Sequence, residues 1–239
     1  MPTHVRSARG DVAPRVILTG DPQRAAELAA RHLQGVRQTN GYRGLLGFRG
    51  ERAGLAVTVQ ATGMGGPSTA IVVEELVRLG ARAFVRLGTC GALDPSLALG
   101  DLVIASSACN LVGAARDLAG LEGHAAAPDP ALLVALVQLA REREPGARCG
   151  PIASMDLFYD PRTELHPRLA RLGVLALEME ASTVFTLGAI HRCPSACLLT
   201  VSDLVASRER ASPEVIAAGV DRLAPLAFEA LAGLDLDGT

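Results

Sequence analysis

Two glutamates that flank a methionine, within residues 177–182 (LEMEAS), have the types and spacing to do chemistry. The apolar run at 173–177 predicts a short buried strand before them, and the stretch 181–190 predicts an apolar helix after them. Carboxylates between two such segments are costly to bury unless a partner hydrogen-bonds to them. A sugar with adjacent hydroxyls is one such partner. A helix start, whose dipole favours acidic residues, is the other interpretation, and spacing alone does not separate the two.

Other residues suited to chemistry follow the ends of further predicted strands. Gly20 follows the predicted strand 15–19 and opens a predicted helix, so backbone amides and Arg24, one turn later, describe an oxyanion site. Residues 86–89 (RLGT) form a second anion-binding corner, with a guanidinium, a flexible glycine and a hydroxyl donor. A surface salt bridge is the alternative for each arginine. The presence of two such corners, at Gly20/Arg24 and at 86–89, favours an anion site, because ligands of open α/β sheets gather beyond the carboxyl ends of the strands.

Asp203 and Phe158 are the candidates for a second half of the site. Asp203 follows the apolar run 197–202, where it is either a helix cap or a general acid whose pKa is raised by that apolar setting. Phe158 and Tyr159 are adjacent in a chain with few aromatic residues, and they offer a face on which a planar base stacks. Packing of Phe158 in the core is the rival interpretation.

The glycine-rich stretch 63–66 is not a dinucleotide-binding fingerprint. Ser68 stands where a third glycine is needed, and the first-strand context is absent. The better interpretation is a tight strand-to-helix turn under a ligand, with Met64 as a soft apolar contact.

Strands and helices alternate along the chain to position these residues. Residues 87–92 are expected to form a loop, and residues 110–128 a surface excursion. No composition break or linker divides the 239 residues, so we expect one α/β domain, residues 1–239, on a largely parallel or mixed sheet. Strands are predicted at 15–19, 83–86, 101–105, near 152 and at 196–202, a hairpin at 45–60, and helices at 23–30, 69–79, 130–141 and 213–234, the last kinked or split at Pro225.

Composition excludes several classes of function. A net charge of −2 argues against binding nucleic acid through a basic surface. No apolar run approaches membrane-spanning length and no signal peptide is evident, so a cytoplasmic protein is expected. The five cysteines are scattered and odd in number, which predicts neither a disulfide framework nor a metal site. All 23 basic residues are arginine, so any permanently charged side chain that grips an anion must be arginine, and P-loop or Schiff-base lysines are excluded.

Six segments follow one another along most of the chain: 19–24 (TGDPQR), 63–68 (GMGGPS), 85–91 (VRLGTCG), 156–159 (DLFY), 177–181 (LEMEA) and 201–203 (VSD). Together they resemble the bacterial hexameric purine nucleoside phosphorylase and uridine phosphorylase family. The resemblance implies a mixed, partly barrel-like central β-sheet flanked by helices, and a homo-hexamer built as a trimer of dimers. It also implies an enzyme without organic cofactor or catalytic metal, for which inorganic phosphate is a co-substrate.

The resemblance implies a role for each matching residue. His4 and Arg43 resemble residues that a neighbouring subunit donates across the dimer interface, and Asp203 resembles the catalytic acid. By motif position, the phosphate site comprises Gly20, Arg24, Arg43, Arg86, Gly88 and Thr89, the ribose site His4, Met64, Met179 and Glu180, and the base site Phe158, Glu178, Ser202 and Asp203.

The implied activity is phosphorolysis of purine ribonucleosides or deoxyribonucleosides to free base and (deoxy)ribose 1-phosphate, in nucleoside salvage. Uridine phosphorylases resemble one another in a glutamine and an arginine shortly after the aromatic residue. Residues 159–164 here carry only Arg162, so purines are favoured. Purine members carry a further arginine past the aspartate, where ungapped counting finds Ile216, and Arg208 or Arg210 are the alternatives.

A uridine phosphorylase, a hydrolytic nucleosidase of similar fold and a non-catalytic nucleoside-binding protein remain as alternatives. A hydrolytic nucleosidase uses water, so it has no use for Arg24, Arg43 and Arg86 as a set. Release of the base without phosphate would favour the nucleosidase. A binding protein would show affinity without turnover.

Overall fold

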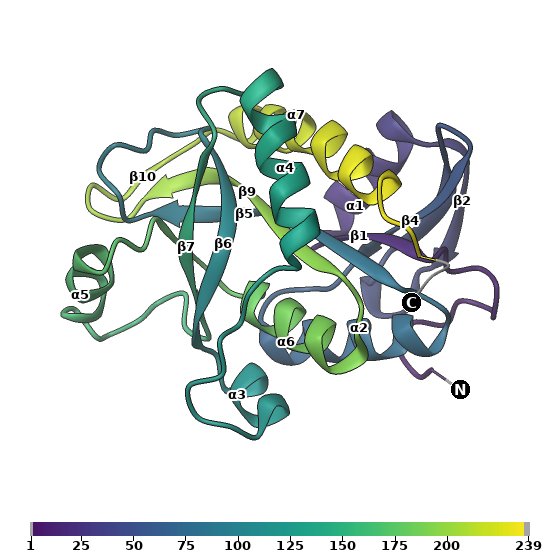
Figure 1. The fold of residues 1–239 in the computed structure, drawn as a ribbon, viewed down its shortest axis with the longest axis horizontal. Coiled ribbons are helices and arrows are strands. Elements are labelled where there is room, and N and C mark those ends of the chain that lie inside the picture. Colours follow the sequence, from purple (N-terminus) through teal and green to yellow (C-terminus); the bar gives the residue numbers. More distant parts are fainter. Residues whose placement is uncertain (1, 237–239) are drawn as a thin grey trace.

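A mixed ten-stranded sheet, seen in a computed structural model that describes residues 2–236, runs through the molecule (Figure 1). Its strands lie in the order β10-β9-β6-β7-β8-β5-β1-β4-β3-β2. The strands are β1 (Arg15–Thr19), β2 (Gln34–Asn40), β3 (Gly47–Arg52), β4 (Leu55–Ala61), β5 (Ala83–Ala92), β6 (Leu102–Leu111), β7 (Arg148–Met155), β8 (Ala176–Glu178), β9 (Ser195–Leu204) and β10 (Glu209–Arg210).

Part of this sheet closes on itself. β5 pairs with β9 in parallel, in addition to its place between β8 and β1, so that β5, β9, β6, β7 and β8 form a closed barrel. The remaining strands, β1, β4, β3 and β2, extend from β5 as an open arm. The predicted fold class, a mixed and partly barrel-like sheet flanked by helices, is therefore confirmed.

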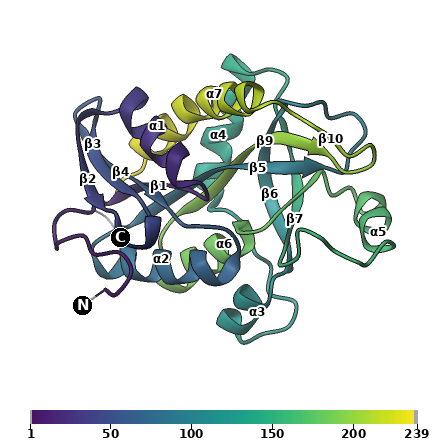
Figure 2. The ribbon, with the colours of Figure 1, turned by 180° about the vertical axis from the view of Figure 1, so that it is seen from behind.

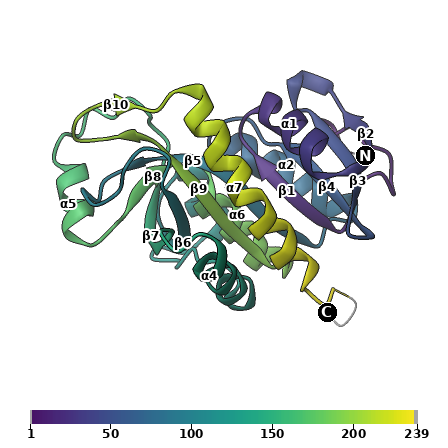
Figure 3. The same cartoon turned by 90° about the horizontal axis from the view of Figure 1, so that it is seen from above.

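Helices cover both faces of the sheet. α1, α4 and α7 lie on one face, and α2 and α6 lie on the other (Figures 1 and 2). Figure 3 shows α7 crossing the junction of barrel and arm, where it packs on β9 and β5. The helices are α1 (Pro22–His32), α2 (Gly66–Arg78), α3 (Gly113–Ala119), α4 (Pro130–Arg143), α5 (Leu165–Arg171), α6 (Ala181–His191) and α7 (Pro213–Ala232), with a 3-10 turn η1 (Tyr42–Gly44).

Local sequence explains where the long helices begin. The Asp21 carboxylate accepts a hydrogen bond from the backbone N–H of Gln23, and Pro22 occupies the first turn of α1, as predicted. Asp129 caps α4 in the same way, and Ser212 caps α7. None of the helices in the described part of the chain is long and apolar enough to cross a membrane.

Three expectations about the elements need correction or completion. The predicted loop at 87–92 is wrong: β5 continues to Ala92, because β9 pairs along it and β8 pairs with its end. Pro225 lies inside α7 without splitting it. The excursion at 110–128 contains the helix α3 and an isolated bridge between Ala108 and Ala126.

Candidate active site

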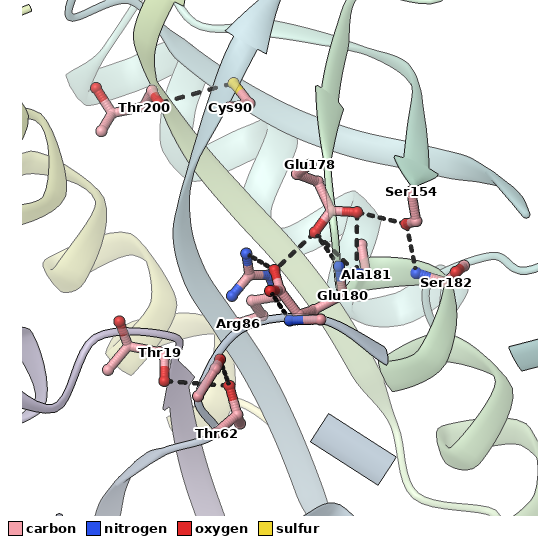
Figure 4. A network of polar contacts seen from close by, with 12 residues as sticks. Thr19, Thr62, Arg86, Cys90, Ser154, Glu178, Glu180, Ala181, Ser182 and Thr200 are labelled. Carbon is pink, nitrogen blue, oxygen red and sulfur yellow. Dashed lines mark hydrogen bonds and ion pairs between the residues drawn. The ribbon is translucent and has the colours of Figure 1, made fainter. Parts of the chain in front are cut away.

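A buried arginine joins the two glutamates that flank Met179 (Figure 4). Arg86 lies within β5, and its side chain reaches the end of β8. Its Nε donates to Oε2 of Glu178 at 3.2 Å, and its Nη2 donates to Oε2 of Glu180. All three residues are buried, with exposed fractions of 4–5%. The partner that these carboxylates need in the interior is thus an arginine from the neighbouring strand.

Glu178 caps the helix that follows it. Its carboxylate accepts hydrogen bonds from the backbone N–H groups of Glu180 and Ala181 at 2.8–3.0 Å, and from the Ser154 hydroxyl. The Ser154 Oγ in turn accepts a bond from the N–H of Ser182 at 2.9 Å. Burial raises the pKa of Glu178, and Arg86 opposes that shift. The helix-start interpretation therefore describes Glu178, whose oxygens fix α6 and Arg86; its predicted contact with a base stays a prediction.

Glu180 connects two turns that carry predicted ribose contacts. Its Oε1 accepts a hydrogen bond from the N–H of Gly65 at 2.6 Å, while its Oε2 accepts from Arg86. This brings the 63–66 turn, with the exposed Met64, against the β8–α6 turn, with the half-buried Met179. A carboxylate has about four acceptor positions, so Glu180 is held in place by two donors and keeps capacity for a pair of hydroxyls.

One terminal nitrogen of the Arg86 guanidinium is available to donate. Its Nη1 is buried and has no hydrogen-bond partner within the described residues. Burial acts to lower the pKa of Arg86, but the charges of Glu180 and Glu178 outweigh it and raise the pKa above its usual value. Gly88 permits this arrangement, because a Cβ at that position would lie 2.7 Å from Arg86 Nη2. A buried, unpaired guanidinium N–H is a donor prepared for an anion.

Arg24 supplies a second cation near Arg86. It is half-buried in the first turns of α1, with its Nη1 3.4 Å from the Thr19 hydroxyl. Burial lowers the pKa of Arg24, Asp21 opposes this, and the positive charge of Arg86 lowers it further, so the two guanidinium groups lie within electrostatic range. Arg24 lines a cleft of about 640 Å³ between α1 and the start of α7.

Two other phosphate candidates are Gly20, just past the end of β1, and Thr89, on β5 with Arg86. Gly20 follows β1, and a Cβ there would lie 3.2 Å from the carbonyl oxygen of Gly63, so the β1 and β4 ends are in close contact. Thr89 lies on β5, three residues past Arg86, rather than in the loop that the sequence predicts.

Ser202 and Asp203 lie near the end of β9. The Ser202 hydroxyl lies 3.2 Å from the carbonyl oxygen of Cys90 and 3.3 Å from Oδ2 of Asp203. Gly91 is opposite Asp203 in the sheet, and a Cβ there would lie 3.0 Å from that same oxygen. Asp203 belongs to the strand, so the helix-cap alternative for it is wrong.

Phe158 is 59% exposed and Tyr159 is 89% exposed, and the two rings meet edge to face at 5.0 Å. The core-packing alternative for Phe158 is therefore wrong.

Of the arginines considered for assisting Asp203, Arg210 is the one that the fold brings near. β10 pairs with β9 so that Arg210 is opposite Asp203, and the Arg210 guanidinium lies 6.0 Å from the centre of the Phe158 ring. Arg208 lies in the preceding turn, with a φ of 61°.

His4 and Arg43 lie on a different part of the molecule. His4 contacts Glu75 of α2, with 3.1 Å between its Nδ1 and the carboxylate. Arg43 is exposed in η1 and has a φ of 56°, a left-handed conformation that costs energy for any residue but glycine. Their predicted roles across a dimer interface stay predictions.

Two residues that hold predicted site residues in place, Ser154 and Glu75, were not found from the sequence. Ser154 gives no local signal, because its importance depends on the pairing of β7 with β8. Glu75 had a signal, an acid within the apolar helical stretch 69–79, whose burial needs compensation. Within residues 2–236, no group of three or more histidine, cysteine or acidic side chains is arranged to hold a metal ion, and the five cysteines are free.

Comparison with known proteins shows similarity to nucleoside phosphorylases. The sequence model of the family described as the phosphorylase superfamily matches residues 14–233. A Jannaschia sp. (strain CCS1) protein named DeoD-type purine nucleoside phosphorylase is 36% identical over 231 residues, covering 96% of this chain and 99% of the relative. Proteins of the same name from Myxococcus xanthus and Geobacillus kaustophilus are 36% and 35% identical, covering 95% and 96% of this chain and 95% and 98% of the relatives.

Proposed function

This chain belongs to the phosphorylase superfamily, and from that premise we propose that it is a purine nucleoside phosphorylase. It is a pentosyltransferase that converts a purine nucleoside and phosphate to free base and ribose 1-phosphate. Ribonucleosides and deoxyribonucleosides are both within this class. The relatives described above carry the purine name, so the uridine phosphorylase and the hydrolytic nucleosidase are not favoured.

The observation that carries the proposal is the free donor of Arg86. A buried guanidinium nitrogen without a partner in the described part of the chain, with Arg24 nearby and Glu180 held beside it, suits an anion next to a sugar. Phosphate is the anion that a phosphorylase needs. Gly20, Gly88 and Thr89 complete the phosphate site on this chain, and Arg43 of another copy adds a further positive charge.

The sugar-side reaction follows from this placement. Phosphate attacks C1′ from the face opposite the base, and an O–C1′ bond forms as the C1′–N9 bond breaks. The bond to the base lengthens first, which gives the sugar oxocarbenium character. Glu180 accepts hydrogen bonds from the 2′ and 3′ hydroxyls, fixes the ring and places negative charge near the developing cation. Met64 and Met179 pack against the sugar.

The base side supplies the proton. The electron pair of the broken bond passes into the purine ring, and Asp203 in its protonated form donates to N7. Arg210, opposite Asp203 in the sheet, is the arginine that assists this transfer. Phe158 stacks on the base, while Ser202 holds the Asp203 carboxyl.

The assembly and conditions of the reaction are part of the proposal. The protein acts as a homo-hexamer, a trimer of dimers, in which His4 and Arg43 complete the site of the dimer partner. His4 contacts the ribose 5′-hydroxyl. The reaction uses no organic cofactor and no catalytic metal, and it takes place in the cytoplasm.

The test is a single assay with inosine, adenosine, guanosine and uridine, each with and without phosphate, in which the free base is measured. We expect release of purine bases only with phosphate, and little release of uracil. Release without phosphate would identify a hydrolase, affinity without turnover a binding protein, and faster release of uracil a uridine phosphorylase.

A further inference from the structure

The Glu75 carboxylate binds the start of the chain through four contacts. It accepts hydrogen bonds from the backbone N–H groups of Thr3, His4 and Val5 at 2.8, 2.8 and 2.6 Å. The fourth contact is with the side chain of His4, at Nδ1. Glu75 lies in α2 and is 7% exposed, and Val5 is fully buried. Residues near a chain terminus are often poorly ordered unless other groups hold them, and here Glu75 supplies much of that support.

The same carboxylate determines how the histidine presents itself. Burial acts to raise the pKa of Glu75, but the three backbone hydrogen bonds and that of His4 outweigh it and lower the pKa to about 2. Glu75 is therefore ionised at neutral pH and only accepts hydrogen bonds. The Nδ1 of His4 must therefore be the donor in this contact, which leaves Nε2 as the ring nitrogen that is available to a hydroxyl.

Asn40 joins the His4 segment to the loop that carries Arg43. It is 4% exposed, and its Oδ1 accepts from the N–H groups of Arg6 at 3.0 Å and Tyr42 at 3.4 Å. Its Nδ2 donates to the carbonyl oxygens of Leu45 and His4. The Arg6 guanidinium also lies 3.3 Å from the centre of the Tyr42 ring. The two segments are thus fixed to each other on one surface.

We propose that Glu75 is a positioning residue, which orients His4 toward the ribose 5′-hydroxyl bound by another copy of this chain, and that Asn40 holds His4 and Arg43 as one unit. The proposal rests on the proposed function, in which these two residues act in trans. Through this unit, one copy contributes to both the sugar and the phosphate sites of its partner. The three backbone hydrogen bonds to Glu75 are enough to fix the N-terminal segment, whereas the additional contact with Nδ1 of His4 fixes the orientation of the ring.

Glu75→Gln tests the proposal, and Glu74→Gln is the matched control. Glu74 is adjacent on α2 but contacts His191, at 2.7 Å, instead of the N-terminal segment. Kinetics are compared for a purine nucleoside and its 5′-deoxy analogue. We expect Glu75→Gln to lower kcat/KM for the nucleoside about tenfold, as for a lost hydrogen bond to a charged group, and to leave the analogue nearly unchanged. Glu74→Gln should change neither.

A double-mutant cycle with His4→Ala separates positioning from folding. The effect of Glu75→Gln should vanish in the His4→Ala background, because the two residues then act as one unit. An equal loss for both substrates, a loss that persists without the His4 ring, or an unchanged substrate ratio in His4→Ala would overturn the proposal. Asn40→Ala should additionally raise the KM for phosphate, and an unchanged KM would refute the shared unit. A wild-type protein without phosphate-dependent purine release would instead refute the proposed function.

Discussion

The two halves of the proposed site are built in opposite ways. In the ribose–phosphate half, Arg86 and Glu180 are buried and hydrogen-bonded to each other, and Glu178, of the predicted base site, fixes both through further hydrogen bonds. In the base half, Phe158 is largely exposed, and Arg210 lies on a two-residue strand at the sheet's edge. The difference indicates that the charges of Arg86 and Glu180 are fixed by folding, whereas the exposed Phe158 would gain its packing from a bound base.

The reason is electrostatic. Charges in a protein interior are stable only while they are paired, so the ribose–phosphate half serves both the stability of the fold and its chemistry. Exposed residues carry no such double role, and their substitution leaves the free energy of unfolding within about 0.5 kcal/mol. Substitutions in the ribose–phosphate half should therefore change stability and activity together. Substitutions of exposed residues in the base half should change activity alone.

The largest effect is expected for Arg86→Met, which leaves two buried carboxylates without their cation. The free energy of unfolding should fall by about 3–5 kcal/mol, and phosphorolysis of every nucleoside should be lost. Urea unfolding and initial rates measure the two effects. Arg116→Met, which removes an exposed pair with Asp117, is the control and should change neither. A stable, active Arg86→Met protein would contradict the described cluster.

Asp203→Asn should separate activity from stability. Loss of the acid should slow purine phosphorolysis about a hundred- to ten-thousand-fold, while the urea midpoint stays within error of the wild type. Full purine turnover by this variant would exclude Asp203 as the proton donor.

Arg210→Gln is expected to lower kcat about tenfold, because the positive charge opposite Asp203 in the sheet is lost. Arg208→Gln, two residues earlier and in the turn, serves as the control and should retain the wild-type rate. Equal losses in both variants would indicate a general effect of charge in this segment rather than a specific partner of Asp203.

The smallest effect belongs to Phe158→Ala. Loss of one stacking face costs about 0.5–1.5 kcal/mol of binding, so the KM for purine nucleosides should rise a few-fold to about tenfold. The free energy of unfolding should not change, because the ring is exposed. A marked loss of stability would show that Phe158 supports the fold.

Local sequence predicted those parts of the fold that depend on local chemistry. The cap and first turn of α1 and the β3–β4 hairpin follow from neighbouring residues, and both are confirmed. The loop predicted at 87–92 failed, because its glycines and polar residues are strand residues only once β9 pairs with them. β2 escaped prediction because its polar, exposed sequence lacks alternation.

The same distinction applies to the site. Residue types and motif order indicated Arg86, Glu178 and Glu180 as site candidates, but they did not predict that Arg86 would pair with both glutamates. That pairing depends on β5 and β8 being neighbours, which no local pattern encodes. The sequence allowed two interpretations of Asp203, and only its place within β9 excluded the helix-cap interpretation.

The closure of the barrel by β5 and β9 has a consequence for folding of the chain as it is synthesised. Arg86 and Glu180 are 94 positions apart, and the strand that locks β5 and β6 together comes later still, at Ser195–Leu204. Until β9 leaves the ribosome, both strands keep an unpaired edge, which invites association with other chains. Such non-local pairing also slows folding. The nascent chain therefore keeps these aggregation-prone edges until the last strand of the barrel has been synthesised.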